Sequence, residues 1–218
     1  LSRAREPGLG RRASSLISPA YDGPMSTTHL LYLHGFRSSP QSAKAQKVGA
    51  RVRAQHPGVT WWCPQLPASP REAMAMLMHG IADWPVASMA VVGSSLGGFY
   101  ATWVAEKTLC RAVLLNPAVN PARDLQKYVG EQTAWHNSDD HFFFKPEFVD
   151  ELCALECGTL AKPKNYFAVI AKGDEVLDWH EMTARYAGAR IRLLSGSDHA
   201  LSDFDLQIDE VFEFLQLA

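Results

Sequence analysis

From His29 onward, short apolar runs alternate with segments of helical length, and this alternation restricts the possible folds more than any other feature of the chain. The apolar runs are predicted to be strands, at residues 30–33, 59–63, 89–92, 112–115, 166–170 and 191–194. The predicted helices lie at residues 39–55, 69–84, 97–107, 179–186 and 204–217. Ser39 and Ser69, each followed by proline, are the predicted caps of the first two. Such alternation predicts an α/β fold, a mainly parallel sheet with helices on both faces. Ligands of such sheets bind at the carboxyl ends of the strands.

A glycine-serine motif follows the predicted strand 89–92 and precedes a predicted helix. Residues 93–97 read Gly-Ser-Ser-Leu-Gly and match the pattern G-x-S-x-G. A sharp strand-to-helix turn here would expose the Ser95 hydroxyl, and the helix N-terminus would direct backbone N–H groups toward a developing oxyanion. An ordinary Gly/Ser turn is the alternative, because the bare pattern also occurs by chance. The setting between strand and helix favours Ser95 as a nucleophile.

A serine nucleophile needs a base, and the base needs an orienting carboxylate. On this kind of fold they follow the serine in the order Asp or Glu, then His. Asp174 lies just beyond the strand 166–170, and His199 follows the strand 191–194. Asp178 is a rival, but it is favoured as the cap of the next helix, and Glu175 is less favoured because adjacent side chains diverge. His199 could instead be an ordinary loop histidine, and the competing downstream histidines are His136, His141 and His180.

An oxyanion hole on this fold takes one N–H donor from the residue after the nucleophile and one from the loop after an earlier strand. Leu96 supplies the first donor. Phe36 is assigned as the second, because Gly35 beside it lets the chain turn in close. His34 is predicted to fix this loop rather than to act as an acid or base.

The alternation of strands and helices breaks down at about residues 120–164, where no clear strand is predicted. This stretch is long for a plain crossover, so we expect a small cap-like insertion over the carboxyl ends of the strands. Its aromatic residues could line an acyl pocket or equally pin the insertion to the core; they are Trp135, Phe142, Phe143 and Phe144. Lysines that could meet a coenzyme A phosphate, although a solvated surface is favoured, are Lys127, Lys145, Lys162 and Lys164.

Composition narrows the classes of partner. The 218 residues carry 21 Lys and Arg against 23 Asp and Glu, which leaves no excess of positive charge for nucleic acid. No apolar run approaches the roughly 20 residues needed to cross a bilayer. The four cysteines form no C-x-x-C pair, so a reduced, cytoplasmic protein is expected. Cys153 and Cys157 could form half of a metal site, but no partner pair with zinc spacing accompanies them, and neither a metal nor another cofactor is expected.

The first 24 residues are rich in Arg, Ser and Gly and show no apolar periodicity. We expect them to be a disordered extension, with an Arg- and Ser-rich transit peptide as the alternative. Residues 25–218 are then a single domain that includes the cap-like insertion, since one chain of this size comfortably builds one core.

Several blocks taken together resemble the small YqiA/YcfP-type esterases of bacteria, within the α/β-hydrolase superfamily. The blocks are Leu31–Phe36, Pro64–Pro67, Val92–Gly98, Asn116–Val119, Gly173–Asp178 and Asp198–Ala200. They follow in order from about Leu30 to the end of the chain, whereas residues 135–144 do not align. The resemblance implies an α/β-hydrolase fold, esterase activity on short acyl esters, thioesterase activity on acyl-CoA as a further option, and a triad of Ser95, Asp174 and His199.

The sequence therefore favours a serine hydrolase that cleaves short to medium acyl esters through an acyl-Ser95 intermediate. An acyl-CoA thioesterase on the same triad is the first alternative. A non-catalytic binding protein on the same fold is the second and is less favoured, because each triad position holds a competent residue type. The expected partner is a small-molecule ester or thioester, with no nucleic acid and no membrane.

Overall fold

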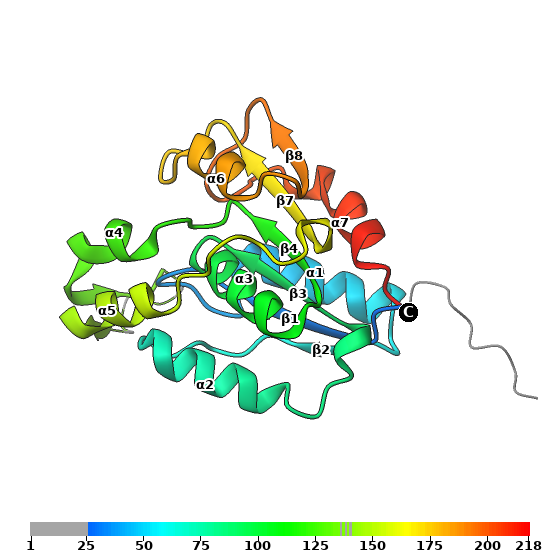
Figure 1. Ribbon diagram of the computed structural model, residues 1–218, viewed down its shortest axis with the longest axis horizontal. Coiled ribbons are helices and arrows are strands. Elements are labelled where there is room, and N and C mark those ends of the chain that lie inside the picture. The colour runs from blue at the N-terminus through cyan, green and yellow to red at the C-terminus, as the bar shows by residue number, and fades with distance from the viewer. Residues whose placement is uncertain (1–25, 136, 138, 140) are drawn as a thin grey trace, which may run out of the picture.

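The computed structural model describes residues 26–135, 137, 139 and 141–218, so the predicted N-terminal extension lies outside the described residues. A six-stranded sheet forms the centre of the molecule, in the order β2-β1-β3-β4-β7-β8, and every neighbouring pair is parallel (Figure 1). The strands are β1 (His29–Leu33), β2 (Thr60–Trp62), β3 (Met89–Ser94), β4 (Arg111–Leu115), β7 (Tyr166–Ala171) and β8 (Arg190–Leu194). Each predicted strand is confirmed, within one or two residues at its ends.

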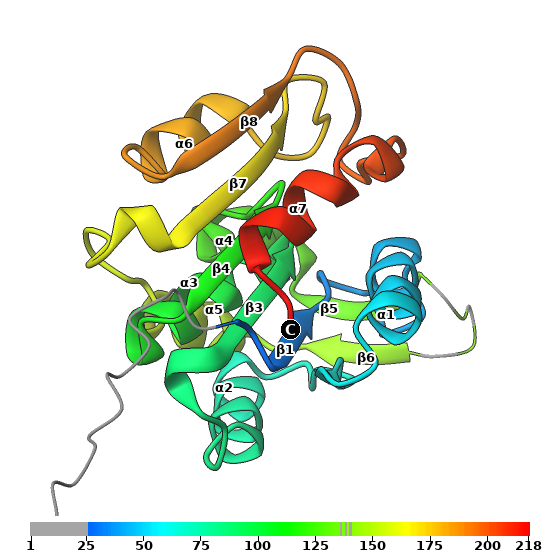
Figure 2. The ribbon, with the colours of Figure 1, turned by 90° about the vertical axis from the view of Figure 1, so that its right-hand side faces the viewer.

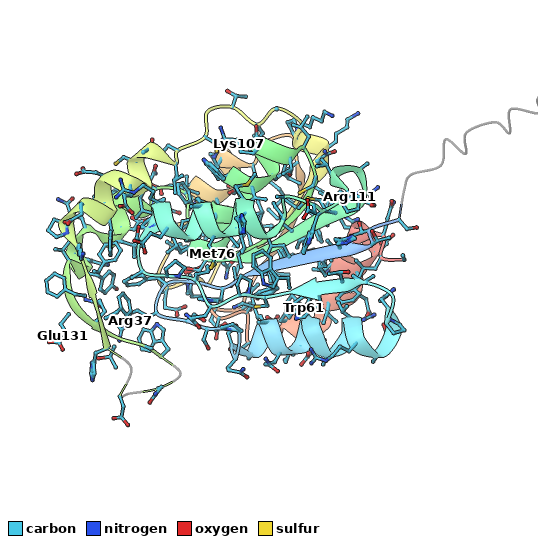
Figure 3. All side chains as sticks on the ribbon, turned by 90° about the horizontal axis from the view of Figure 1, so that it is seen from below. Arg37, Trp61, Met76, Lys107, Arg111 and Glu131 are labelled. Atoms are coloured by element: carbon cyan, nitrogen blue, oxygen red, sulfur yellow. The ribbon has the colours of Figure 1, made fainter. Side chains whose placement is uncertain are left out.

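Helices cover both faces of this sheet, because the buried strands carry apolar side chains on both sides. In β1, Leu30 and Tyr32 pack toward α1 (Ala43–Gln55) and α7 (Ile208–Leu215). Leu31 and Leu33 point to the other face, toward α2 (Pro70–Gly80), α3 (Leu96–Thr108) and α6 (Trp179–Arg185). Figure 3 shows α1 and α2 on opposite sides of the strands, and in Figure 2 α7 lies in front of them.

Two Ser-Pro pairs in the sequence have different structural outcomes. Ser69 caps α2 as predicted, because its hydroxyl accepts a hydrogen bond from Glu72 N at 3.2 Å and Pro70 takes the first turn. The prediction that Ser39 caps the first helix, at residues 39–55, is wrong. Ser39 instead closes a tight turn in which its hydroxyl accepts from Gln41 N at 3.1 Å, and α1 begins only after Ser42.

The 120–164 segment contains α4 (Pro121–Leu125), a hairpin of β5 (Gly130–Thr133) and β6 (His141–Phe144), and α5 (Pro146–Ala154). The expectation of no clear strand here is wrong, since β5 and β6 pair in antiparallel register. Figure 1 shows α4 and α5 beyond one end of the sheet, and in Figure 3 Arg37 lies at that end, far from Arg111 at the start of β4. The segment therefore lies at the carboxyl ends of the strands.

Short 3₁₀ turns complete the described chain, at Val86–Ser88, Gln126–Tyr128, Pro163–Asn165 and Phe204–Leu206. The last of these precedes α7, so the predicted terminal helix at 204–217 is a 3₁₀ turn followed by a shorter α-helix. Across the described ranges, no helix combines the length and the apolar character that a bilayer-spanning segment requires.

Candidate active site

Ser95 stands on the turn that joins β3 to α3, in a strained backbone conformation with φ 55° and ψ −121°. The turn is possible because two glycines lie where the backbone passes very close to neighbouring segments. A Cβ atom at Gly97 would lie 2.0 Å from the Leu33 carbonyl oxygen, and one at Gly93 would lie 2.1 Å from the Gly97 carbonyl oxygen. The two glycines of the motif therefore allow α3 to start directly against the ends of β1 and β3, which exposes the Ser95 side chain above the sheet.

The structure brings Ser95, His199 and Asp174 into one hydrogen-bonded chain. His199 Nε2 lies 3.0 Å from Ser95 Oγ, and His199 Nδ1 lies 2.8 Å from Asp174 Oδ2. The Asp174 side chain is fully buried, and its other oxygen accepts from Val176 N and Leu177 N, both at 2.8 Å. A carboxylate can only accept, so it pairs with the histidine tautomer that carries its proton on Nδ1 and leaves Nε2 as an acceptor facing Ser95 Oγ.

The rival carboxylates have other roles. Asp178 Oδ1 accepts from His180 N at 2.8 Å and thereby caps α6, so it is occupied away from His199. Glu175 Oε2 accepts from the backbone N of His199 at 3.0 Å and helps to fix the loop that carries His199. Of the competing histidines, His141 contacts Thr133 on the hairpin, His180 lies at the start of α6, and His136 lies outside the described residues.

Asn116 is a residue that the sequence reasoning missed as part of this site. It ends β4 with φ 43° and is fully buried. Its Nδ2 donates to the carbonyls of Asp198 at 2.9 Å and His199 at 3.2 Å, and its Oδ1 accepts from Ala171 N at 2.8 Å. Asn116 therefore joins the end of β7, which leads to Asp174, to the loop that carries His199. An Asn-Pro pair directly after a strand was the available signal, because Asn readily adopts positive φ.

The loop after β1 passes directly beside Ser95. A Cβ atom at Gly35 would lie 3.3 Å from Ser95 Cβ, so the backbone of Phe36 is brought next to the serine. His34 is buried and holds this loop: its Nδ1 pairs with Gly35 O at 3.0 Å, and its Nε2 accepts from Leu66 N at 3.2 Å. These contacts agree with the structural role predicted for His34. Leu96 is the first residue of α3, where backbone N–H groups have no intrahelical partner.

Two cavities border Ser95 and His199. The first, here called the insertion cavity, has a volume of about 180 Å³ and lies under the 120–164 segment, with Leu96, Leu125, Tyr128, Val176 and Leu177 among its walls. The second, here called the helix cavity, has a volume of about 270 Å³ and lies at the start of α1, with Ser38, Ser42 and Lys44 among its walls. Phe36 and Trp135 line both cavities, so these two aromatic side chains lie between them.

The four aromatic residues proposed for the acyl pocket are placed differently from one another. Trp135 is 74% exposed, and the guanidinium of Arg37 lies 4.1 Å from its ring centroid. Phe142 and Phe144 line a neighbouring cavity with Phe36, and the buried Phe144 packs edge-on against Phe36. Phe143 is 57% exposed and, of the cavities found among the described residues, lines neither of those at Ser95. Phe144 therefore pins the hairpin to the core, and of the four aromatic residues only Trp135 lines the described cavities at Ser95.

The lysines considered for a coenzyme A phosphate are also dispersed. Lys162 and Lys164 lie at the 3₁₀ turn just before β7, which is the amino end of that strand, whereas Ser95 lies at the carboxyl ends. A six-residue strand separates the two ends by about 20 Å, beyond the reach of a side chain. Lys145 lies over the Phe148 ring, and of the four lysines only Lys127 lines the insertion cavity.

No metal-binding cluster is found among the described residues, where no three His, Cys, Asp or Glu side chains converge as ligands would. Cys153 is exposed and Cys157 is half-buried, and the structure records both as free thiols.

The sequence matches the model of the family described as "Uncharacterised protein family (UPF0227)" over residues 29–216.

Solved structures from several organisms have similar folds. Est1E from Butyrivibrio proteoclasticus with bound ferulic acid superposes with a TM-score of 0.69 at 15% identity, over 87% of this chain and 88% of that one. The esterase Pf2001 from Pyrococcus furiosus has a TM-score of 0.60 at 19% identity, over 88% and 81% of the two chains. Mouse alpha/beta hydrolase domain-containing protein 10 has a TM-score of 0.61 at 16% identity, over 88% and 92%. The predicted α/β-hydrolase fold is therefore confirmed.

Proposed function

This chain belongs to the uncharacterised protein family UPF0227, the YqiA/YcfP family that its sequence resembles, and we propose that it is a serine hydrolase that cleaves small carboxylic esters. The proposed acyl groups are short to medium in length. One observation carries the proposal: the continuous hydrogen-bonded chain from Ser95 Oγ through His199 to the buried Asp174, at 3.0 and 2.8 Å. Catalysis by an activated serine requires this arrangement of nucleophile, base and orienting carboxylate.

The proposed reaction begins when Ser95 Oγ attacks the ester carbonyl carbon and His199 Nε2 takes the hydroxyl proton. Asp174 stabilises the resulting imidazolium without taking up a proton itself. The carbonyl oxygen becomes an oxyanion, for which the backbone N–H groups of Leu96 and Phe36 are the proposed donors. The carbon–oxygen bond to the alcohol then breaks, and His199 returns its proton to the departing alcohol.

The second half of the reaction releases the acid. A water molecule loses a proton to His199 Nε2 and attacks the acyl-Ser95 carbonyl, and the bond to Ser95 Oγ breaks as that oxygen regains the proton. The apolar walls of the insertion cavity, which include Leu125 and Leu177, offer room for the acyl chain at about 180 Å³. Ferulic acid bound to the structurally similar Est1E is compatible with a small carboxylic ester as substrate.

Hydrolysis of 4-nitrophenyl esters with acyl chains of increasing length tests the proposal. We expect kcat/KM to be highest for short to medium chains. Ser95→Ala should lower kcat at least about a thousandfold, and Asp174→Asn by about ten-thousandfold, because it removes the carboxylate that holds the histidine tautomer. Asp178→Asn is the matched control, since Asp178 caps α6 and should affect kcat little.

The alternatives predict different results in the same assay. An acyl-CoA thioesterase would show a higher kcat/KM on acyl-CoA than on an oxygen ester of the same chain length. A non-catalytic binding protein would stay folded but turn over neither class, and full activity of Ser95→Ala would refute the assignment of the nucleophile.

A further inference from the structure

The two cavities at Ser95 correspond to the two halves of an ester. During attack, the carbonyl carbon is held at Ser95, and its acyl and alkoxy substituents must extend in different directions. The insertion cavity and the helix cavity both reach Ser95 and His199, with Phe36 and Trp135 between them. Each substituent can therefore occupy a separate space.

The linings of the two cavities differ in chemistry. The insertion cavity has an apolar wall that includes Leu96, Leu125 and Leu177, and its charged members are Arg37, Asp124 and Lys127. The helix cavity is lined by the polar residues Ser38, Ser42 and Lys44, with Ala43 and Ala200 beside them. Among the described residues that line the helix cavity there is no Asp or Glu. An apolar acyl chain fits the first lining, and a polar leaving group fits the second.

Lys44 is held beside the loop that carries His199 by a specific hydrogen bond. Its Nζ donates to the carbonyl oxygen of Ala200, the residue after His199. An ammonium carries three N–H donors, and this hydrogen bond uses one of them. Ser42, two residues before Lys44, is the N-cap of α1, and its side chain makes no capping hydrogen bond in the part of the chain that the structure describes. Both side chains can thus present donors to a molecule in the cavity.

The charge of Lys44 is partly desolvated. Burial lowers the pKa of Lys44 to about 8, although Asp198 and Asp174 act in the opposite direction. These two carboxylates are engaged elsewhere, since Asp174 pairs with His199 and Asp198 accepts from Ser202 Oγ at 2.6 Å. A cation that has lost part of its hydration gains from an anionic ligand that approaches through the cavity.

We propose that the helix cavity binds the leaving-group half of the ester and that Lys44 selects alcohols or thiols that carry an anionic group near the scissile bond. A carboxylate and a phosphate share the required chemistry. The inference rests on the proposed ester hydrolysis at Ser95 and specifies its substrate class. A phosphate as remote from the reacting sulfur as those of coenzyme A lies outside this class, because Lys44 and Ser95 line the same cavity of about 270 Å³.

The test compares butyrate esters that differ only in one substituent of the leaving group. The substrates are 3-carboxyphenyl, 3-phosphonooxyphenyl and 3-carbamoylphenyl butyrate, of which the last is neutral and close in size to the first. The wild-type protein should have a higher kcat/KM for at least one anionic ester than for the neutral one. The ratio of interest is kcat/KM for the anionic ester divided by kcat/KM for the neutral one. Lys44→Gln should lower this ratio about tenfold, which lies between the effects of an exposed ion pair and of a buried charged hydrogen bond. Lys44→Arg should largely keep the ratio.

The ratio separates selectivity from a general role of Lys44 in holding the His199 loop. Loss of the Ala200 contact lowers kcat/KM for all three esters alike and leaves the ratio unchanged. Lys47→Gln is the matched control, because Lys47 lies one turn further along α1, pairs with Asp205 at 2.6 Å and should leave the ratio at its wild-type value. An unchanged ratio in Lys44→Gln overturns the inference but not the proposed hydrolysis. Failure of the wild-type protein to hydrolyse even the neutral ester overturns both.

Discussion

Replacement of Asn116 should damage both the stability of the protein and the reactivity of Ser95. The side chain is fully buried and makes three hydrogen bonds to backbone groups, at Ala171 N, Asp198 O and His199 O. These partners belong to the segments that lead to the proposed carboxylate and carry the proposed base. A change at this position is therefore expected to disturb the geometry between Asp174 and His199 without touching either residue.

The magnitude follows from the groups that lose their partners. Asn116→Ala leaves the buried Ala171 N–H without an acceptor, which costs about 1–3 kcal/mol, and removes two donated hydrogen bonds at about 0.5–1.5 kcal/mol each. Alanine also tolerates the positive φ of 43° less well than asparagine, by roughly 1 kcal/mol. We expect a loss of about 3–7 kcal/mol in the free energy of unfolding. Asn116→Gly removes the same hydrogen bonds without the backbone strain, so it should be less destabilising than Asn116→Ala.

Asn116→Asp tests the positioning role more selectively. Aspartate tolerates the backbone conformation and can still accept from Ala171 N, but it replaces the donor that holds the Asp198 and His199 carbonyls by a second acceptor. The rate constant for labelling by a fluorophosphonate probe, measured on folded protein, should fall at least about tenfold, since one misplaced catalytic group can cost much more. Urea unfolding provides the stability. Wild-type stability and labelling in both Asn116→Ala and Asn116→Asp would refute this reasoning.

Three further predictions concern backbone contact, a buried hydroxyl and pH. Gly97→Ala should lower the free energy of unfolding, measured by urea titration, by at least about 1–3 kcal/mol, because the new Cβ would lie 2.0 Å from the Leu33 carbonyl oxygen. Gly58→Ala is the control and should lose no stability in the same titration, because there is open space around its new Cβ. Tyr32→Phe should leave the melting temperature unchanged or raise it, because the buried Tyr32 hydroxyl has no hydrogen-bond partner among the described residues. A marked fall would show that this hydroxyl makes a hydrogen bond in solution. Burial lowers the pKa of Lys44 to about 8 in the folded protein, below its value of about 10.4 in the unfolded protein. Between these two pH values the unfolded state binds more protons than the folded state, so the free energy of unfolding should rise with pH across that window. The rise should be smaller in Lys44→Gln, as unfolding at pH values on either side of about 9 can show.

The parallel sheet was predictable from the sequence because its strands are buried on both faces. Runs such as Leu30–Leu33 and Tyr166–Ile170 are continuously apolar and are separated by segments with helical spacing, a pattern that few other folds produce. Ser95, Asp174 and His199 could be placed for a related reason, since each follows such a run directly and the carboxyl ends of parallel strands meet at one edge. The structure brings these three together, as their positions in the sequence suggested.

The parts that were not predictable depend on contacts between distant residues. The β5 strand reads Gly-Glu-Gln-Thr and has no apolar alternation, so only its pairing with β6 makes it a strand. Ser39 has the local signature of a helix cap, but its hydroxyl is used in a tight turn before α1. The role of Asn116 arises from bonds to residues 55 and more positions away in the sequence. Periodicity and local motifs do not contain this information.

Chemical labelling tests the central claim, that Ser95 is a nucleophile activated by His199, most directly. The protein is incubated with a fluorophosphonate and digested with trypsin, and the modified residue is identified by mass spectrometry. The account predicts one adduct, on Ser95 in the peptide of residues 72–107, which is absent in Ser95→Ala and forms much more slowly in His199→Ala. Ser202→Ala, which removes a serine from the His199 loop, should label at the wild-type rate. An adduct on another residue, or unchanged labelling of Ser95→Ala, would contradict the account.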